Sequence, residues 1–444
     1  MRHFMVHDRS PSALALAAEH GPTLGPGLRR IALIGNYLPR RCGIATFTSD
    51  IHRAFAKRFP NVVVDVWAMN DGGRHYAYSA PVVGSIDDED PESYLAAVRA
   101  IAVSAPDLVW IQHEFGIFGG PAGDLLLRLL TGLECPVAVT LHTILSSPDR
   151  DQRRVMEALI ARCETLIVMA EEGRRLLIDI YGADPSRICV IPHGIPDRVF
   201  APTAPMKGRL GLTGREVILT FGLLSPGKGV ETMLAAMPAI VAQQPTALFI
   251  ILGATHPHTI ATSGEAYRDE LKALATRLEL GDHVRWIDAF VETDELLDFL
   301  EAADVYVTPY LNPAQITSGT LAYAVGLGKP VVATPYVHAC ELLAGGHGRL
   351  VDFGDSLGFA DAITDLLADP EALLALRMRT YALGRTMIWP RFAEAASARF
   401  NAVTVAANRL AQARCADTIP PRRPMVGARQ MDLVAPSPVS AAAA

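Results

Sequence analysis

Four small and hydroxylic residues stand directly before a short helix-compatible segment in the second half of the chain. They are Thr317, Ser318, Gly319 and Thr320. The segment 321–325 follows, Gly326 and Gly328 end it, and a β-branched strand begins at residue 331. Backbone N–H groups at a helix start point outward, at the positive end of the helix dipole. The pattern therefore indicates a site for a phosphate or diphosphate; an ordinary N-capped helix between two strands is the alternative.

A lysine stands at a second predicted helix start. Residues 222–229, Gly-Leu-Leu-Ser-Pro-Gly-Lys-Gly, follow an apolar strand and open a helix. Lys228 would project there toward a bound phosphate, because the start of a helix attracts anions. A surface lysine beside a turn is the alternative.

Polar side chains follow two predicted strands of the first half. His142 comes at the end of the apolar run 136–144, and Glu114 follows the strand that begins at residue 107. His142 could contact a substrate in a cleft or bond to the backbone as a structural residue. Glu114 could accept a hydrogen bond from an acceptor hydroxyl or belong to a structural loop.

Gly43 would let the chain turn tightly before a predicted helix.

Two series of alternating strands and helices must position these residues. Apolar runs alternate with helical segments through residues 29–198 and again through 213–386, which predicts parallel sheets with helices on both faces. Residues 199–212, with Pro and Gly and no periodicity, are expected to be the linker. A final helix is expected over 387–415. The flanking segments are expected to be a poorly ordered leader, 1–28, and a disordered tail, 416–444.

Composition limits the class of protein. The chain of 444 residues carries a net charge of −7, so no excess of basic residues points to nucleic acid. Its six cysteines are scattered without a Cys-x-x-Cys pair, which is typical of reduced thiols in a cytoplasmic protein. No apolar run reaches the ~18 residues of a membrane-spanning helix. His256 and His258 have no third ligand motif nearby, so no metal site is predicted.

The second half resembles the donor-binding half of the family-4 retaining glycosyltransferases, which have the GT-B fold. The resemblance rests on the segments PVVATPYVHACELL, 330–343, and GRLVDFGD, 348–355. Segment 315–336 is similar to the mannosyltransferase-like branch. The two glutamates that the family usually carries here fall on Gln315 and Tyr323, a variant expected in this branch.

The resemblance, over roughly residues 30–412, implies an α/β protein of two doubly wound Rossmann-like domains that face a central cleft. It implies that Lys228 and the helix start after Thr317 hold the donor diphosphate, with backbone N–H groups of Ser318, Gly319 and Thr320. Gln315 would contact sugar hydroxyls, and Tyr323 would pack near the ribose. In the first domain, His142 would contact the transferred sugar, Gly43 would approach sugar and phosphates, and Glu114 would lie on the acceptor side.

Departures from the family pattern remove charge from the donor site. Leu223 stands where the family usually has an arginine that binds the diphosphate. Arg40 and Arg41, before the first-domain glycine, could supply the missing charge or form a solvated pair. His193 replaces a common asparagine and is expected to belong to the hinge.

The implied function is that of a retaining glycosyltransferase. It would move a sugar, mannose first, from a nucleotide sugar to a glycan, lipid-linked or other hydroxyl acceptor in polysaccharide or glycoconjugate biosynthesis. GDP-mannose is the first candidate donor and UDP-glucose the second, with no required cofactor or metal. A cytoplasmic location is implied, with peripheral contact at the inner face of the membrane left open. The alternatives are a GT-B sugar-nucleotide epimerase, which product analysis with donor alone distinguishes, and a non-catalytic sugar-nucleotide-binding protein. Donor binding without turnover across a panel of acceptors would favour the latter.

Overall fold

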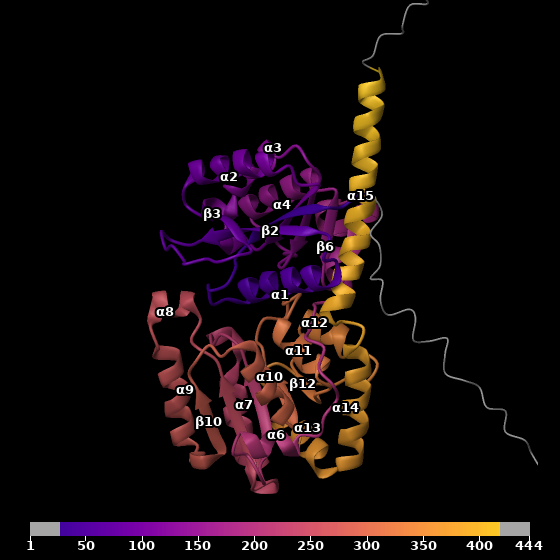
Figure 1. Cartoon of the computed structure of the whole chain (residues 1–444). Coiled ribbons are helices and arrows are strands. Elements are labelled where there is room, and N and C mark those ends of the chain that lie inside the picture. The colour runs from indigo at the N-terminus through magenta and orange to yellow at the C-terminus, as the bar shows by residue number, and fades with distance from the viewer. Residues whose placement is uncertain (1–26, 418–444) are drawn as a thin grey trace, which may run out of the picture.

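Parallel strands form both sheets in residues 27–417, the part of the chain that the computed structural model describes. The two sheets belong to two domains, one above the other in Figure 1. The predicted leader falls almost wholly outside the described residues, as does nearly all of the predicted tail. Among the helices of residues 27–417, none combines the length and the apolar character that crossing a bilayer requires.

The first sheet has seven strands in the order β3-β2-β1-β4-β5-β6-β7. Its strands are β1 (Arg30–Gly35), β2 (Val63–Asn70), β3 (Val82–Asp87), β4 (Leu108–His113), β5 (Val137–Leu141), β6 (Thr165–Val168) and β7 (Ile188–Val190). Its helices are α1 (Gly43–Arg58), α2 (Pro91–Ser104), α3 (Leu126–Gly132), α4 (Arg150–Arg162) and α5 (Glu171–Tyr181). The chain order reverses at β1 and β4, where a doubly wound sheet binds ligands beyond the carboxyl ends of its strands.

The second sheet has six strands in the order β10-β9-β8-β11-β12-β13. Its strands are β8 (Glu216–Phe221), β9 (Ala247–Leu252), β10 (Val284–Ile287), β11 (Val305–Thr308), β12 (Val331–Ala333) and β13 (Arg349–Leu350). The helices around it are α6 (Ala204–Arg209), α7 (Val230–Gln243), α8 (Pro257–Ser263), α9 (Ala266–Arg277), α10 (Thr293–Ala302), α11 (Gly319–Gly326), α12 (Val337–Leu342), α13 (Ser356–Ala368) and α14 (Pro370–Gly384). Two parallel sheets with helices on both faces confirm the predicted fold class.

Burial on both faces explains why the central strands are apolar throughout. In β1, Ile31 and Leu33 pack in the core beneath α1, whereas Ala32 and Ile34 pack in the core on the other face. Successive side chains of a strand point to opposite faces, so a strand covered on both faces needs apolar residues at every position. This is the signal that marked these strands in the sequence.

The edge strand β3 carries a weaker signal. Its six residues, VVGSID, are mostly half-buried or exposed, and only Ile86 is buried. The sequence pattern had not indicated a strand there, because an edge strand need not be apolar throughout.

The chain passes between the domains twice, and the two passages are joined. The N–H of Ile195 donates to the carbonyl of Met387 at 3.0 Å, and the N–H of Trp389 donates to the carbonyl of Ile195 at 3.0 Å. Within the expected linker 199–212, α6 packs on the second domain, where the Lys207 Nζ lies 2.6 Å from a carboxylate oxygen of Asp304. The two passages therefore form one hinge.

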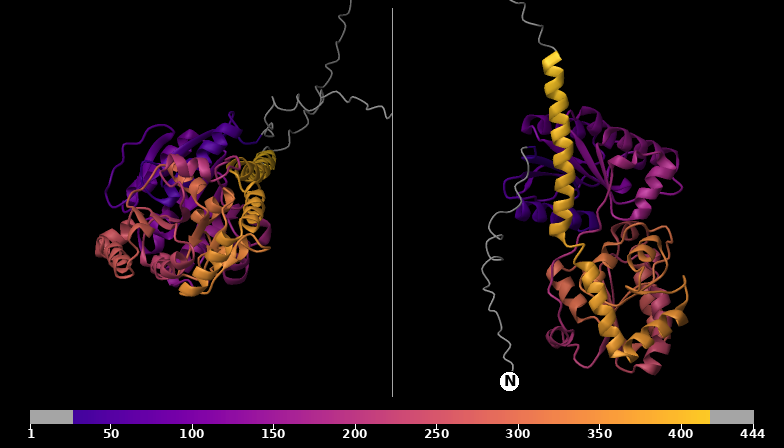
Figure 2. Two further views of the ribbon diagram at one scale, coloured as in Figure 1. Left: turned by 90° about the horizontal axis from the view of Figure 1, so that it is seen from below. Right: turned by 90° about the vertical axis from the view of Figure 1, so that its right-hand side faces the viewer.

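The last helix, α15 (Trp389–Asp417), runs back along the first domain (Figure 1), and Figure 2 shows the same course from the side. Phe392, Ala396 and Phe400 are buried in the core beneath α1. Their spacing of four residues places them on one face of the helix. The helix thus ties the end of the second domain to the first.

Candidate functional site

The start of α11 is capped in a way that leaves two amide groups without a partner. The Oγ of Ser318 accepts from the N–H of Leu321 at 3.3 Å, and the N–H of Ser318 donates to Nδ1 of His338 at 2.9 Å. The N–H groups of Gly319 and Thr320 have no acceptor among residues 27–417. The sequence had predicted that three amides bind a diphosphate; the amide of Ser318 is already engaged, so two remain.

Lys228 lies next to this helix start. It ends a short 3₁₀ turn, Pro226–Lys228, and its Nζ lies 4.0 Å from the centre of the Tyr310 ring. The hydroxyl of Tyr310 is 2.7 Å from Oγ1 of Thr320, in the first turn of α11. Among the ion pairs of residues 27–417, none includes Lys228. Its charge is therefore held against Tyr310, which contacts the first turn of α11, and no carboxylate of residues 27–417 pairs with it.

Two glycines lie close to the start of α11. A Cβ added to Gly222 would lie 3.3 Å from Cγ2 of Thr320, and one added to Gly253 would lie 1.9 Å from the carbonyl oxygen of Gly222. Both glycines have positive φ, 131° and 149°. Glycine is favoured at both positions by the positive φ, and at Gly253 also because the backbone of Gly222 leaves no room for a Cβ.

The remaining predicted donor-site residues hold the segment before α11 and the helix itself. The Nε2 of Gln315 donates to the carbonyl of Thr317 at 2.9 Å, and both residues are partly buried. Tyr323 is 6% exposed, and its hydroxyl donates to Oδ2 of Asp50 at 2.9 Å, across the domain boundary. Contacts of Gln315 with a sugar and of Tyr323 with a ribose stay predictions.

His142 follows β5 on the first domain. Its Nε2 lies 3.2 Å from Oε1 of Gln112, and the ring of Phe47 packs edge-on at 4.8 Å. Burial, with His193 and His113 nearby, lowers the pKa of His142 to about 3. The imidazole is therefore neutral at neutral pH and can exchange hydrogen bonds with a hydroxyl without carrying charge.

Glu114 lies beside His142, because β4 and β5 are neighbours in the sheet. Its Oε2 accepts from Oγ1 of Thr143 at 2.6 Å, and its Oε1 accepts from the N–H of Phe115 at 3.0 Å. Burial raises the pKa of Glu114, and these two hydrogen bonds act in the opposite direction. The structure thus places Glu114 and His142 at the ends of two neighbouring strands, and their contacts with acceptor and sugar stay predictions.

His113 lies in the core and not in the site. It is 0% exposed, and neither ring nitrogen has a hydrogen-bond partner among the described residues. Its ring packs against Phe115 and Phe118, and burial lowers its pKa to about 3.

Gly43 begins α1 and is exposed, with no atom within 4 Å of an added Cβ. Nη1 of Arg40 lies 3.0 Å from Oδ1 of Asn36, and its Nη2 lies 3.6 Å from a carboxylate oxygen of Asp71. Arg41 is exposed. Arg40 is therefore already paired, and the substitution of either arginine for the missing second-domain cation stays a prediction.

Three residues at the domain boundary were not predicted as site residues. His338 bonds to the cap residue of α11, and His193 lies against the same helix start, with its Nε2 2.9 Å from the position of a Cβ on Gly319. Burial lowers the pKa of His193 to about 4 and that of His338 to about 3. Asp50 is the third. A histidine inside PYVHACELL and a carboxylate on a mostly buried helix face were the available signals.

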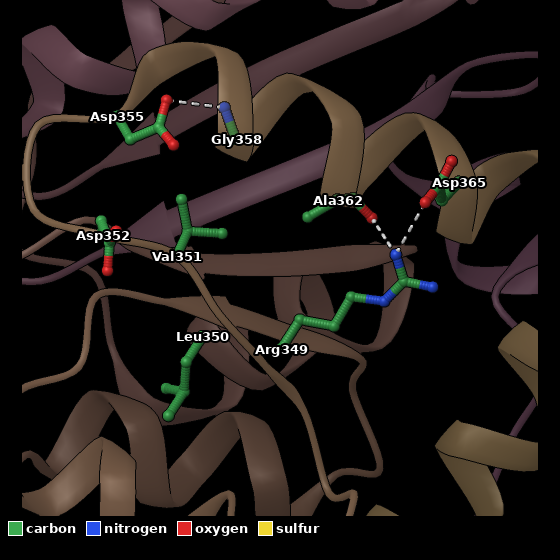
Figure 3. A pocket seen from close by; sticks show the side chains of 8 residues that line it. All are labelled: Arg349, Leu350, Val351, Asp352, Asp355, Gly358, Ala362 and Asp365. Atoms are coloured by element: carbon green, nitrogen blue, oxygen red, sulfur yellow. Dashed lines mark hydrogen bonds and ion pairs between the residues drawn. The ribbon is translucent and has the colours of Figure 1, made fainter.

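A surface hollow lies away from this site. It measures about 550 Å³ and lies between β13 and α13, where Asp352, Arg349 and Asp365 line it (Figure 3). Arg349 donates to Asp365 at 3.2 Å, and Asp355 caps α13 by accepting from Gly358 at 2.8 Å. These contacts explain the polar groups as parts of the fold. Residues 27–417 contain no cluster of three His, Cys, Asp or Glu side chains suited to a metal.

Comparison with known proteins relates both domains to one group. A family model described as Glycosyltransferase Family 4 matches residues 42–199, and one described as Glycosyl transferases group 1 matches 215–369. A D-inositol 3-phosphate glycosyltransferase of Geodermatophilus obscurus is 31% identical over 371 residues, 75% of this chain and 79% of the relative. One of Kineococcus radiotolerans is 31% identical over 262 residues, which span 55% of this chain and only 57% of that relative.

Solved structures share the two-domain arrangement. Anabaena HepE in complex with UDP superposes with a TM-score of 0.65 at 17% identity, over 86% of this chain and 100% of that one. A glycosyltransferase of Rickettsia africae gives 0.66 at 12% identity, over 84% and 98%. At these identities the likeness concerns the fold alone.

Proposed function

Because the chain belongs to glycosyltransferase family 4 and has the GT-B fold, we propose that it is a retaining transferase. The donor would be a nucleotide sugar bound to the second domain, and the acceptor a hydroxyl compound bound to the first. Mannose stays the first candidate sugar, because segment 315–336 resembles the mannosyltransferase-like branch.

The start of α11 carries this proposal. Two free amides, of Gly319 and Thr320, and the unpaired charge of Lys228 converge where a diphosphate would bind. Such donors stabilise the negative charge that grows on the leaving oxygen, and they need little reorganisation because the fold already holds them. No metal ion is needed in this scheme, since lysine and helix amides bear the charge.

The reaction breaks the bond between the anomeric carbon and the diphosphate oxygen and forms one to the acceptor oxygen. With retention, the acceptor attacks the same face that the diphosphate leaves, and a diphosphate oxygen takes the acceptor proton. Neutral His142 would bind a hydroxyl of the transferred sugar, and Glu114, 2.6 Å from Thr143, would face the acceptor. Closure of the domains would exclude water, which otherwise hydrolyses the donor.

We name the donor and the acceptor by chemical class only, a nucleotide sugar and a hydroxyl compound. HepE has been crystallised with UDP and with UDP-glucose, so UDP-glucose is tested beside GDP-mannose. The inositol-phosphate relatives add a phosphorylated polyol to the panel of acceptors.

A thermal-shift screen of UDP, GDP, UDP-glucose and GDP-mannose tests the proposal first. A ligand at about 100 times its dissociation constant stabilises the folded protein by about 2.7 kcal/mol. Stabilisation by one sugar nucleotide and its nucleoside diphosphate, followed by transfer to an acceptor, is the expected result. Failure of all four to bind would contradict the proposal.

A non-catalytic binding protein is the second candidate. Gln315, Tyr323 and Leu223 stand in place of charged residues, which favours binding without turnover. Donor binding with neither transfer nor donor hydrolysis across the acceptor panel would support it, and an altered donor sugar without acceptor would point to an epimerase.

A further inference from the structure

Side-chain hydrogen bonds join the two domains at two places in residues 27–417. At the exposed edge, Glu341 on α12 accepts from the N–H groups of Glu171 and Glu172 on α5. The other place is buried. The hydroxyl of Tyr323 on α11 donates to Oδ2 of Asp50 on α1 at 2.9 Å, although 273 positions separate the two residues. Asp50 is 8% exposed and Tyr323 is 6% exposed. A hydrogen bond to a carboxylate in such a place is stronger than one in water.

The same face of α1 also contacts the candidate sugar-binding histidine. Phe47 precedes Asp50 by three residues, so the two side chains lie on one face of the helix. The Phe47 ring packs edge-on against His142 at 4.8 Å and against His193 at 5.1 Å. A movement of α1 at Asp50 therefore moves the ring that packs on His142.

The contacts return to α11 through the hinge. His193 belongs to the first passage between the domains, and its Nε2 lies 2.9 Å from where a Cβ of Gly319 would be. The two helices are therefore in contact at two places. His193 lies between Gly319 on α11 and Phe47 on α1. Tyr323 on α11 bonds to Asp50 on α1.

The far end of α11 is held by the hinge as well. The Arg385 Nη2 donates to the carbonyl of Gly326 at 2.7 Å, and Ile195 packs so closely that a Cβ on Gly326 would lie 2.0 Å from its Cδ1. The helix therefore extends from the hinge to the free amides, with Tyr323 between them.

We propose that Asp50 and Tyr323 form a pivot between the domains, which sets the position of His142 relative to the free amides of α11. The two are positioning residues, and neither needs to touch the substrate. This inference rests on the proposed sugar transfer for its kinetic consequence only. The amides of Gly319 and Thr320 and the charge of Lys228, which would hold the diphosphate, all belong to the second domain. Loss of the pivot should therefore leave nucleoside diphosphate binding unchanged and lower turnover.

The test compares Tyr323→Phe, Asp50→Ala and Asp50→Asn with the parent in the full chain. Tyr94→Phe is the matched control, because the buried Tyr94 also uses its hydroxyl in hydrogen bonds, but within the first domain. The hydroxyl donates to the backbone carbonyl of Asp88 at 3.0 Å and accepts from the N–H of Gly119 at 3.2 Å. Three readouts are taken: affinity for UDP or GDP, turnover with the donor, and the radius of gyration from small-angle X-ray scattering.

Tyr323→Phe and Asp50→Ala are expected to lower turnover about tenfold or more, the scale of one hydrogen bond to a charged group. Both should broaden the scattering distribution, with nucleoside diphosphate affinity unchanged. Asp50→Asn keeps an oxygen acceptor and should recover most of the turnover. Tyr94→Phe should leave specific activity unchanged.

Two results overturn the pivot. If Tyr323→Phe has the turnover and the scattering of the parent, the hydrogen bond between Tyr323 and Asp50 does not set the position of the domains. A loss of nucleoside diphosphate affinity as large as the loss of turnover would instead place Tyr323 at the ribose. If no nucleotide binds the parent, the proposed function fails, while scattering from the unliganded variants still decides the pivot.

Discussion

Nδ1 of His338 accepts the backbone N–H of Ser318 at 2.9 Å, and so fixes the residue whose side chain caps α11. His338 is 3% exposed, so no water replaces it easily. The bond turns the Ser318 amide away from any ligand and holds the next two amides at the helix start.

Removal of this acceptor should destabilise the protein and weaken anion binding together. His338→Ala leaves a buried amide unsatisfied, which costs about 1–3 kcal/mol. His338→Asn places an amide oxygen near the position of Nδ1, so it should retain part of the stability and part of the anion affinity. Urea unfolding measures the stability, and titration with nucleoside diphosphate measures the affinity. If His338→Ala matches the parent in both measurements, His338 does not hold the cap of α11.

Asp50 should make stability depend on pH in mildly acidic solution. Burial raises the pKa of Asp50 from 3.8 to about 6, opposed by the Tyr323 hydroxyl and by Arg53, whose Nη1 lies 3.5 Å away. The folded protein then binds more protons than the unfolded chain between these values, so stability falls as the pH rises from about 4 to 6.

The expected loss is roughly 2–3 kcal/mol, at 1.36 kcal/mol per pKa unit. Asp50→Asn cannot titrate, so the difference in unfolding free energy between parent and variant isolates the carboxyl group. A difference that is flat from pH 4 to 7 would contradict the raised pKa.

Local patterns predicted the elements and the side chains that leave them at the carboxyl ends of strands. His142 and Glu114 lie together because consecutive apolar runs became neighbouring parallel strands. Lys228 lies near α11 because the strands that precede the two segments, β8 and β11, are also neighbours. The sequence could not show which partners cross the domain boundary. Asp50 and Tyr323 come from distant segments, and nothing in either segment specifies the other. The engagement of the Ser318 amide likewise depends on the histidine of another helix, α12.

His142→Ala should lower turnover with little change in melting temperature. His142 is partly exposed at the end of β5, and its partner is the side chain of Gln112 at 3.2 Å. Because its pKa is about 3, the turnover of the parent should show no titration of His142 between pH 6 and 8. A large loss of stability with normal specific activity in the folded fraction would restore a structural role.

Gln315→Ala should weaken discrimination among sugar nucleotides more than it weakens binding of free nucleoside diphosphate. Its Nε2 is held by the carbonyl of Thr317 at 2.9 Å, which leaves the amide oxygen to accept from a sugar hydroxyl. Titration of GDP-mannose against GDP, and of UDP-glucose against UDP, measures the difference. Equal losses for sugar nucleotide and nucleoside diphosphate would place Gln315 away from the sugar.

Lys228→Ala is expected to have the largest effect on turnover. With Leu223 in the position of the family's arginine, Lys228 is the cation left in the segment 222–229. Its Nζ lies 4.0 Å from the Tyr310 ring, whose hydroxyl reaches Thr320 at 2.7 Å, so the charge is held close to the free amides. Loss of one preorganised donor to a developing anion costs on the order of 100- to 1,000-fold in rate.

The loss of donor affinity should be smaller, because the contact strengthens as charge grows on the leaving diphosphate. Lys228→Arg should recover part of the turnover, limited by the different shape of the guanidinium. Lys57→Ala, at an exposed lysine near the end of α1, controls for loss of one surface charge. Sugar transfer, or donor hydrolysis where no acceptor is known, is measured beside binding. Loss of a transition-state donor is expected to lower turnover far more than about threefold. If Lys228→Ala keeps its turnover within about threefold of the parent, Lys228 does not bind the leaving diphosphate, and the main argument for catalysis fails.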